Sequence, residues 1–363
     1  MKTTEFQSNE QSYQSLLTLV VNQFIVKNGT HSTVNCSPLE INDFSICFGI
    51  DFFGDQGPKG LYVKIPKADL YKSKKKGVFP LTDDDRRFAE EEYESLIYLS
   101  QSWKSYDLNI VFVKPVGFIK EYNAIVTEKV YAKDLFKLFR RRDLIRRLNL
   151  YDKNDPMHNI LSRIGTGLSR FHQNLVKVVK FDLSEIVSKV DYYCLLLNSF
   201  GIDRNFLDSI IARLLKFEDY NPPTDITHTL KGLDLRNILV DREKNLFMLD
   251  PGKIKQNYIE ADLARFLVTC RILYWGSVVF FSGICPDSSY EERFLQGYYC
   301  GKERNNKLLA ILIIKELFKH WLMAYEALQL KWWPGAMKYL LRKTYIDQFY
   351  KGQLTSEIAE LER

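Results

Sequence analysis

The first third of the chain alternates between one helix-like segment and short apolar runs typical of strands. Residues Ser12–Val26 carry apolar side chains at helical spacing and predict an N-terminal helix. The runs that follow are rich in β-branched and aromatic residues and are separated by Gly-containing turns. They predict an antiparallel meander with strands at Thr33–Leu39, Ser45–Phe53 and Leu61–Ile65.

A helix and further strands follow this meander. Residues Asp83–Ser100 begin with acidic side chains, which suit the positive end of a helix dipole. Asn109–Phe118 and Asn123–Val130 have strand-like patterns, and the rest of the chain is mostly helical in its spacing. The order predicts an α+β protein in two lobes. A small antiparallel sheet with one helix would occupy residues 1–128, and a large helical lobe would occupy residues 129–363.

Composition narrows the function classes only slightly. The chain has 363 residues, of which 46% are hydrophobic and 26% charged, as expected for a globular protein. A net charge of +6 without a basic recognition motif does not indicate nucleic-acid binding. The six cysteines form no CxxC pair and predict no zinc site. Because no apolar run reaches the ~20 residues of a membrane span and no signal peptide is evident, we expect a cytoplasmic protein.

Arginines are concentrated between Arg140 and Arg147 in the predicted helical lobe. A charge run of this kind is usually a solvated helix face. The functional alternative is binding of an anionic substrate or peripheral contact with an anionic membrane surface.

The segment Thr227–Gly252, THTLKGLDLRNILVDREKNLFMLDPG, predicts a metal site. Asn237 and Asp250 stand at the outer ends of two apolar runs that are joined by a turn. Because a hairpin brings such ends together, the two side chains are expected to converge. An amide oxygen and a carboxylate suit Mg²⁺, and Mg²⁺ on the phosphates of ATP stabilises charge during phosphoryl transfer.

This segment resembles the catalytic core of the aminoglycoside-phosphotransferase and protein-kinase superfamily. In that superfamily an Asn before an NILVD strand, and an Asp followed within two residues by Gly, hold the metal. The resemblance implies these roles for Asn237 and Asp250, with Pro251 in place of the usual aromatic residue.

Motifs of the nucleotide site occur in the order that this superfamily would have. The sequence LYVK resembles the third-strand lysine motif, which implies that Lys64 contacts the α- and β-phosphates of ATP. The following helix resembles the one whose glutamate pairs with that lysine, which implies this role for Glu92. The sequence VTEKV lies where the adenine-contacting hinge is expected and implies Glu128 and Val130 as contacts.

Further motifs resemble the helical lobe of the superfamily. Ile164–His172 resembles the helix before the catalytic loop, with His172, like His228, expected to be structural. Asp262-Leu263-Ala264 resembles the downstream motif whose aspartate accepts backbone hydrogen bonds from that loop.

The catalytic loop departs from the superfamily pattern. Counting back from Asn237 places Leu230 at the expected His and Gly232 at the expected Asp, and glycine cannot take part in acid–base chemistry. In one interpretation the loop is remodelled and Asp234 orients the acceptor hydroxyl. In the other, the chain is a pseudokinase that binds nucleotide or serves as a scaffold.

The resemblance as a whole implies an ATP- and Mg²⁺-dependent phosphotransferase. The region Pro38–Phe44 has no Gly-rich phosphate loop, which favours the branch that acts on small molecules. A small-molecule or glycan-like hydroxyl would then be the acceptor, bound by the aromatic-rich C-terminal helices.

Overall fold

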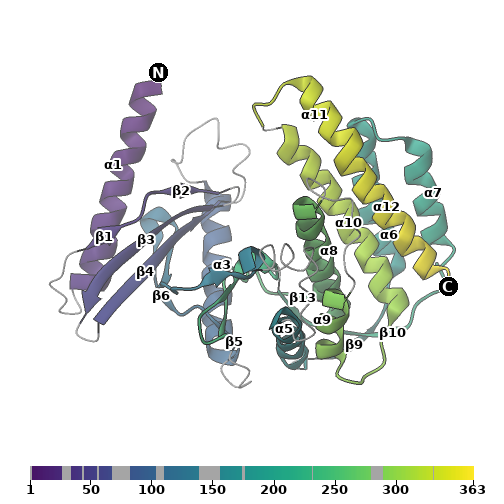
Figure 1. The fold of residues 1–363 in the computed structure, drawn as a ribbon, viewed down its shortest axis with the longest axis horizontal. Helices are drawn as coiled ribbons and strands as arrows, with labels where there is room; N and C mark the ends of the chain where they lie inside the picture. Colours follow the sequence, from purple (N-terminus) through teal and green to yellow (C-terminus); the bar gives the residue numbers. More distant parts are fainter. Residues whose placement is uncertain are drawn as a thin grey trace. The chain divides into compact units, whose positions relative to one another are not determined.

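The computed structural model (Figure 1) describes residues 2–26, 34–42, 45–54, 57–67, 82–103, 110–138, 156–173, 176–230, 232–278, 289–329 and 331–363. By the packing of its residues the chain divides into two compact units. Unit 1 contains Met1–Lys133 and Asn237–Ile254, and unit 2 contains Asp134–Arg236 and Lys255–Arg363.

Unit 1 combines antiparallel strands with helices. Its helices are α1 (Lys2–Val20), which continues into η1 (Val21–Ile25), α3 (Asp83–Ser102) and η4 (Lys120–Tyr122). Its larger sheet has the order β1-β3-β4-β7-β6, with β2 paired to β3. These strands are β1 (Asn35–Cys36), β2 (Glu40–Ile41), β3 (Ser45–Gly54), β4 (Gly57–Pro66), β6 (Pro115–Ile119) and β7 (Ala124–Glu128). A smaller sheet contains β5 (Ile110–Phe112), β11 (Ile238–Val240) and β12 (Leu246–Met248), and β8 (Lys133–Asp134) lies where the chain passes into unit 2.

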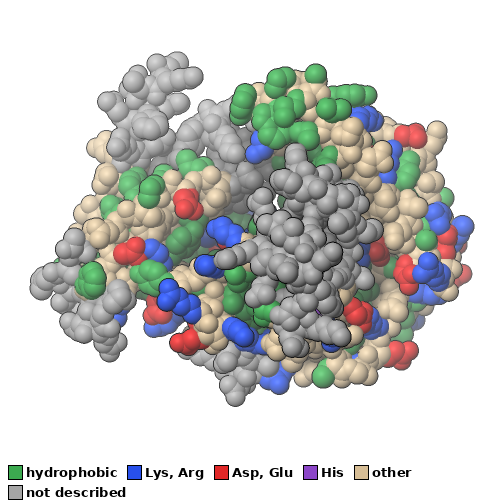
Figure 2. Space-filling model, in the orientation of Figure 1, with side chains coloured by type: hydrophobic (Ala, Val, Ile, Leu, Met, Phe, Trp, Pro, Cys, Tyr) green, Lys and Arg blue, Asp and Glu red, His purple; other side chains and the backbone are tan. Residues whose placement is uncertain are grey.

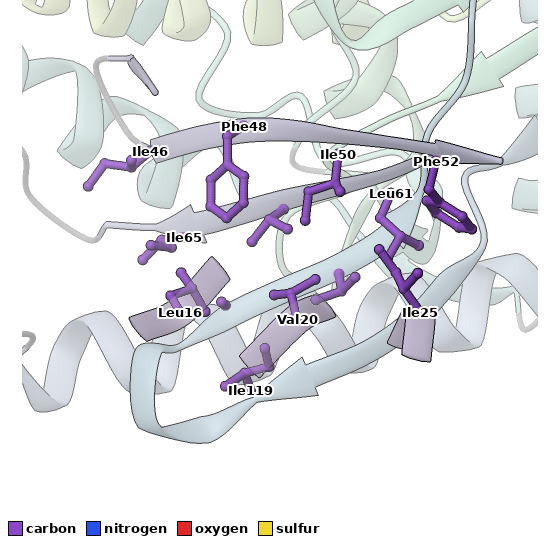
Figure 3. Close-up of a cluster of buried hydrophobic side chains, with 13 residues drawn as sticks. Leu16, Val20, Ile25, Ile46, Phe48, Ile50, Phe52, Leu61, Ile65 and Ile119 are labelled. Atoms are coloured by element: carbon purple, nitrogen blue, oxygen red, sulfur yellow. The ribbon is translucent and has the colours of Figure 1, made fainter. Parts of the chain in front are cut away.

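The larger sheet of unit 1 buries one face against α1 (Figure 3). Side chains of a strand alternate between the two faces of a sheet, so every second residue of β3 and β4 reaches this core. The core residues of these strands are Ile46, Phe48, Ile50, Phe52, Leu61, Val63 and Ile65. Leu16 and Val20 of α1 are completely buried against them. Lys64, which stands between Val63 and Ile65, therefore projects from the opposite face of the sheet.

Helix α3 is formed where the sequence predicts a helix. Thr82 and Asp85 form a capping box, in which the Thr82 hydroxyl accepts from Asp85 N–H at 3.1 Å and the Asp85 carboxylate accepts from Thr82 N–H at 3.0 Å. The buried face of the helix includes Ala89, Glu92 and Leu96, at spacings of three and four residues. The Glu92 carboxylate therefore lies on the buried, mostly apolar face of the helix.

Some predictions for unit 1 were wrong in detail. Of the predicted strand Thr33–Leu39, the described residues 34–39 form a strand only at Asn35–Cys36, which pairs with β3. Asn109–Phe118 contains two strands instead of one, since β5 pairs with β12 whereas β6 pairs with β7. Helix α1 begins at Lys2 and not at Ser12. Apolar spacing marks only the part of this helix that packs against the sheet.

The hairpin β11–β12 packs with unit 1, although the sequence placed it within residues 129–363. β12 runs parallel to β5, with Leu246 opposite Ile110 and Met248 opposite Phe112. A parallel pair needs a long connection, and nothing in the local pattern of either strand indicates it. By packing, the first break between the units falls after Lys133 and not after residue 128.

Unit 2 is mostly helical. Its helices are α5 (Pro156–His172), α6 (Leu183–Ser199), α7 (Arg204–Leu215), α8 (Ile259–Val278), α9 (Ser289–Tyr299), α10 (Asn306–Gln329), α11 (Gly335–Leu341), η6 (Arg342–Ile346) and α12 (Asp347–Leu361). An antiparallel sheet has the order β13-β10-β9, with β9 (Lys177–Lys180), β10 (Pro223–Thr229) and β13 (Lys255–Tyr258). The cluster Arg140–Arg147 lies outside the described residues.

Helix α10 forms the centre of unit 2. Most of its residues from Leu308 to Tyr325 are buried, and it packs against α6, α8 and α12 (Figure 1). Helices α5 and α9 approach each other through two glycines. A Cβ atom on Gly165 would lie 2.2 Å from the Phe294 carbonyl oxygen, and one on Gly297 would lie 2.1 Å from that of Ser162.

The short helix α11 has no buried residue, and neither has η6, which follows it directly. Met337, Tyr339 and Leu340 are all exposed, and hydrophobic side chains gather over this helix in Figure 2. Among the described helices, none has both the length and the apolar character required to cross a membrane.

Candidate functional site

The first group of candidate residues lies in unit 1 around Lys64. The Lys64 ammonium contacts a Glu92 carboxylate oxygen at 2.7 Å and an Asp250 carboxylate oxygen at the same distance. β4 supplies the lysine, the buried face of α3 supplies Glu92, and the residue after the hairpin supplies Asp250. Three segments that are far apart in the sequence thus bring their charged groups to one point.

The charges around Lys64 do not cancel, because one ammonium faces two carboxylates. Burial and the nearby Asp250 charge raise the pKa of Glu92 to about 7, against the lowering effect of Lys64. Burial alone would lower the pKa of Lys64, but Asp250 and Glu92 together raise it above its ordinary value. The second Glu92 oxygen is buried without a hydrogen-bond partner among the described residues. A cation beside these carboxylates would relieve their repulsion.

Asp250 has an uncommon backbone conformation. Its φ of 38° lies in the left-handed region, and Gly252 follows with a φ of 62°. Aspartate tolerates this region better than most residues, although it is less favourable than the right-handed one. Such conformations are concentrated at functional sites. The turn leaves the Asp250 side chain 39% exposed, so one part of the carboxylate contacts Lys64 and the remainder is accessible.

Asn237 stands at the end of the hairpin that also carries Asp250. The Asn237 carbonyl accepts a hydrogen bond from Leu249 N–H at 2.7 Å, which extends the β11–β12 pairing by one residue. Asn237 and Asp250 are therefore near neighbours at one end of the hairpin, as the sequence predicts. An amide oxygen with a carboxylate is a donor set that suits Mg²⁺.

The two predicted adenine contacts lie at and just after the end of β7. The Glu128 side chain is exposed and pairs with Lys114 at 2.8 Å. Glu128 N–H donates to the Lys114 carbonyl at 2.9 Å. Val130 is half-buried in an irregular segment after the strand.

Asp234 lies in unit 2, in the loop that follows β10. Its side chain is buried, and both carboxylate oxygens accept hydrogen bonds from Arg236, two residues further along the chain. Oδ1 accepts from Arg236 N–H at 2.8 Å and from Nε at 3.0 Å, and Oδ2 accepts from a terminal guanidinium nitrogen at 2.6 Å. The Arg236 side chain is 62% exposed. This arrangement fixes the carboxylate against an arginine whose own side chain is mostly exposed.

Asp262 fixes the start of the same loop within unit 2. One of its oxygens accepts a hydrogen bond from Leu230 N–H at 2.6 Å and contacts His172 Nε2 at 3.2 Å. This is the bracing contact that the Asp262 motif implies. The sequence did not indicate that His172, at the end of α5, would take part in it.

Two further contacts of the loop were missed. His172 Nδ1 lies 2.9 Å from the Tyr298 hydroxyl on α9, and a terminal guanidinium nitrogen of Arg265 donates to the Leu230 carbonyl at 2.9 Å. A buried histidine and an arginine three residues after the bracing aspartate were the available signals. Their partners lie on other helices, so neither signal identifies the contact.

The sequence matches no protein-family model and no curated protein, but solved structures are similar in fold. Choline kinase LicA from Streptococcus pneumoniae is 15% identical, with 93% of this chain and 98% of that chain covered and a TM-score of 0.50. The ADP-bound aminoglycoside phosphotransferase APH(2'')-Ib is 9% identical, with coverage of 93% and 97% and a TM-score of 0.52. A glucosamine kinase in complex with glucosamine, ADP and inorganic phosphate is also 9% identical, with coverage of 90% and 80% and a TM-score of 0.52.

Identities this low establish the fold and not the reaction. Other structural neighbours are an ethanolamine kinase from Plasmodium vivax and a macrolide 2'-phosphotransferase from Brachybacterium faecium. The similarity extends over nine-tenths of the chain or more in each case. The chain therefore has the α+β fold that these small-molecule kinases and phosphotransferases share.

Proposed function

We infer that the chain is an ATP- and Mg²⁺-dependent phosphotransferase that acts on a hydroxyl group of a small molecule or glycan-like acceptor. The observation that carries this inference is the contact of Lys64 with both Glu92 and Asp250 at 2.7 Å. A lysine held by a helix glutamate beside a metal-binding aspartate is the arrangement that kinases use on ATP phosphates. The small-molecule kinases and phosphotransferases among the structural neighbours support the acceptor class.

The residues present fit a magnesium nucleotide. Lys64 would contact the phosphates, while Glu92 would hold the lysine in place. Asp250 and Asn237 would hold Mg²⁺, which supplies positive charge against the phosphate oxygens when it is bound. The excess negative charge at Glu92 and Asp250 supports this assignment, because a divalent cation would neutralise it. Glu128 and Val130 would contact adenine.

Asp234 would orient the acceptor hydroxyl and take its proton as the oxygen attacks the terminal phosphorus. The bond between that phosphorus and ADP breaks in the same displacement. Gly232 occupies the position from which this carboxylate would ordinarily come, so the activity depends on Asp234. Because Arg236 is exposed, its guanidinium can move away from Asp234 without disrupting the core of unit 2.

A specific observation favours a second candidate, a pseudokinase that binds nucleotide or acts as a scaffold. Both Asp234 oxygens already accept hydrogen bonds from Arg236, which competes with an acceptor hydroxyl for the same carboxylate. Such a chain would bind ATP through Lys64 without transferring the phosphoryl group.

The first experiment measures ATP consumption with Mg²⁺ in a coupled assay against a panel of hydroxyl compounds. Asp250→Ala is expected to abolish turnover, while Glu243→Ala in the exposed turn of the same hairpin is expected to retain it. Full turnover by Asp250→Ala would refute the proposed metal role. Thermal stabilisation of the wild-type protein by Mg·ATP, with no turnover on any acceptor, would instead identify the pseudokinase.

A further inference from the structure

A cluster of charged side chains lies between α8 and α10 in unit 2, beside the loop that begins at Leu230. We call Arg265, Lys315, Glu316 and Lys319 the α8–α10 charge cluster. Glu316 is at its centre, with only 1% of its side chain exposed. Lys315 and Lys319 each contact it at 3.1 Å, and Arg265 Nε lies 3.9 Å from its Oε2.

The cluster carries more positive than negative charge. It contains three cations and one carboxylate, and within the described residues no other carboxylate lies within 4.0 Å of any of the three cations. The Arg265 and Lys315 side chains are only 16% and 11% exposed, so water compensates little of this charge. Uncompensated charge in a partly buried site is unfavourable for folding. It is therefore a sign of a function that needs it.

The excess charge is adjacent to the proposed catalytic loop. Arg265 donates to the Leu230 carbonyl at 2.9 Å, which ties the cluster to the start of the loop. His320, which follows Lys319 on α10, lies within electrostatic range of both Glu316 and Asp234. Burial and the positive charges of Lys319 and Arg265, against the raising effect of Glu316, lower the pKa of His320 to about 4, so this imidazole adds no positive charge at neutral pH. The Lys319 side chain is 32% exposed, so it is the cation of the cluster most open to a ligand.

We propose that the α8–α10 charge cluster binds an oxyanion carried by the acceptor, so that the substrate is a hydroxyl compound bearing a phosphate or carboxylate group. This inference rests on the proposed function for the link to turnover, although the oxyanion site itself does not. Lys319 makes the direct contact, while Arg265 and Lys315 add to the positive potential. Glu316 keeps the two lysines in position, since each ammonium lies 3.1 Å from one of its oxygens.

The inferred charge preference separates this chain from several of its structural neighbours. The names of those neighbours include choline, ethanolamine and glucosamine, which are cationic at neutral pH. A site with two excess positive charges repels a cation and attracts an anion at close range. Proteins that share this fold can therefore bind different acceptors, because the acceptor is selected by side chains that differ between them.

A binding experiment tests the oxyanion site without any need for turnover. Inorganic phosphate is titrated calorimetrically into protein carrying Lys64→Gln, a background that removes the lysine of the proposed nucleotide site. Lys319→Gln in this background should weaken phosphate binding by about tenfold or more, as loss of a charge-assisted contact does. Lys319→Arg should retain binding. Lys307→Gln, an exposed lysine of the same helix that stacks on Phe217, should change it less than about twofold.

A turnover experiment then tests the acceptor class with the otherwise unaltered chain. Glucose, glucosamine, glucuronate and glucose 6-phosphate share one ring and differ in charge, so they form a matched series of acceptors. ATP consumption is expected with one or both anions and not with glucosamine, and the two anions distinguish carboxylate from phosphate. Preference for glucosamine, or phosphate binding that is unchanged in Lys319→Gln, would overturn the inference. Phosphate binding that depends on Lys319, without turnover on any acceptor, would leave the oxyanion site standing and refute the proposed activity.

Discussion

Lys64 and Asp250 meet at 2.7 Å, and this contact joins the lysine strand to the end of a hairpin that lies far along the sequence. Asp250 shares the ammonium with Glu92, so the lysine has two competing anionic partners. In the proposed function the two carboxylates have different roles. Glu92 would hold the lysine in place, and Asp250 would hold a metal ion. A nucleotide phosphate arriving at Lys64 would loosen its contact with Asp250, and Mg²⁺ would compensate the carboxylate.

Replacing Lys64 should therefore affect nucleotide binding more than folding. Lys64→Met is expected to weaken Mg·ATP binding by roughly 10- to 100-fold, the usual effect of removing a charged hydrogen-bond donor. The measurement is calorimetric titration with Mg·ATP, alongside the melting temperature of the free protein. Lys59→Met is the matched control, because Lys59 lies on the same strand and is exposed. Equal affinity in the two variants would exclude Lys64 from the phosphate site.

Asp234 is the residue on which the proposed activity depends. Asp234→Asn keeps the shape of the side chain and removes its ability to take a proton, so kcat should fall by roughly 10²- to 10⁴-fold. The KM for ATP should change little, because Asp234 would contact the acceptor. Steady-state kinetics of Asp234→Asn and of the surface variant Asp219→Asn test this difference. A kcat that is unchanged in Asp234→Asn would place the proton acceptor elsewhere.

Much of the proposed nucleotide site could be expected from the sequence because its signals are local. Short motifs carry the resemblance that implies the roles of Lys64 and Glu92, and the ends of a hairpin must converge. The same reasoning did not find the parallel pairing of β5 with β12, which joins segments far apart in the chain. It also treated Asn109–Phe118 as one strand instead of two, since a change of sheet does not alter the alternation of apolar residues.

The charge balance of a site is harder to predict than its members. Glu92 was expected to pair with Lys64, yet nothing in the sequence shows that Asp250 contacts the same ammonium. The α8–α10 charge cluster gives no sequence signal either, because Arg265 and Glu316 are brought together only by the packing of two helices. Local patterns place a residue on a face, and tertiary packing decides which charges meet there.

The pH dependence of stability should reveal a half-buried glutamate at the start of α8. Burial raises the pKa of Glu260 to about 7 from its ordinary 4.5. Between these two pH values Glu260 keeps its proton in the folded protein and loses it in the unfolded chain. The contribution of Glu260 to stability therefore falls as pH rises from 4.5 to 7 and is constant above. The Glu260→Gln variant lacks this titration, so its free energy of unfolding should fall by about 1–3 kcal/mol less over this pH range. Urea denaturation at pH 5 and pH 8 measures it, with exposed Glu218→Gln as the control.

The packing of α1 on the sheet can be tested by two substitutions in one helix. Leu16 is completely buried, so Leu16→Ala should lower the free energy of unfolding by about 2–5 kcal/mol through lost contacts and the cavity left behind. Leu19 is 40% exposed on the same helix, and Leu19→Ala should change it by less than about 0.5 kcal/mol. Similar losses in both variants, measured by chemical denaturation, would mean that α1 does not pack as described.

Replacement by alanine should have opposite effects at two glycines. One glycine lies where α5 and α9 approach closely, and the other lies in α12 with open space around it. Gly297→Ala would place a Cβ atom 2.1 Å from the Ser162 carbonyl oxygen, and a backbone atom cannot move aside without separating the helices. We expect it to destabilise the protein by about 3 kcal/mol or more, as severe overpacking does. Gly352 lies within α12 with no atom within 4 Å of its added Cβ. Gly352→Ala should therefore stabilise the protein by about 0.5–1 kcal/mol, because alanine favours the helix. Thermal and urea denaturation of both variants distinguish crowding from helix propensity, and stabilisation by Gly297→Ala would contradict the described contact between the two helices.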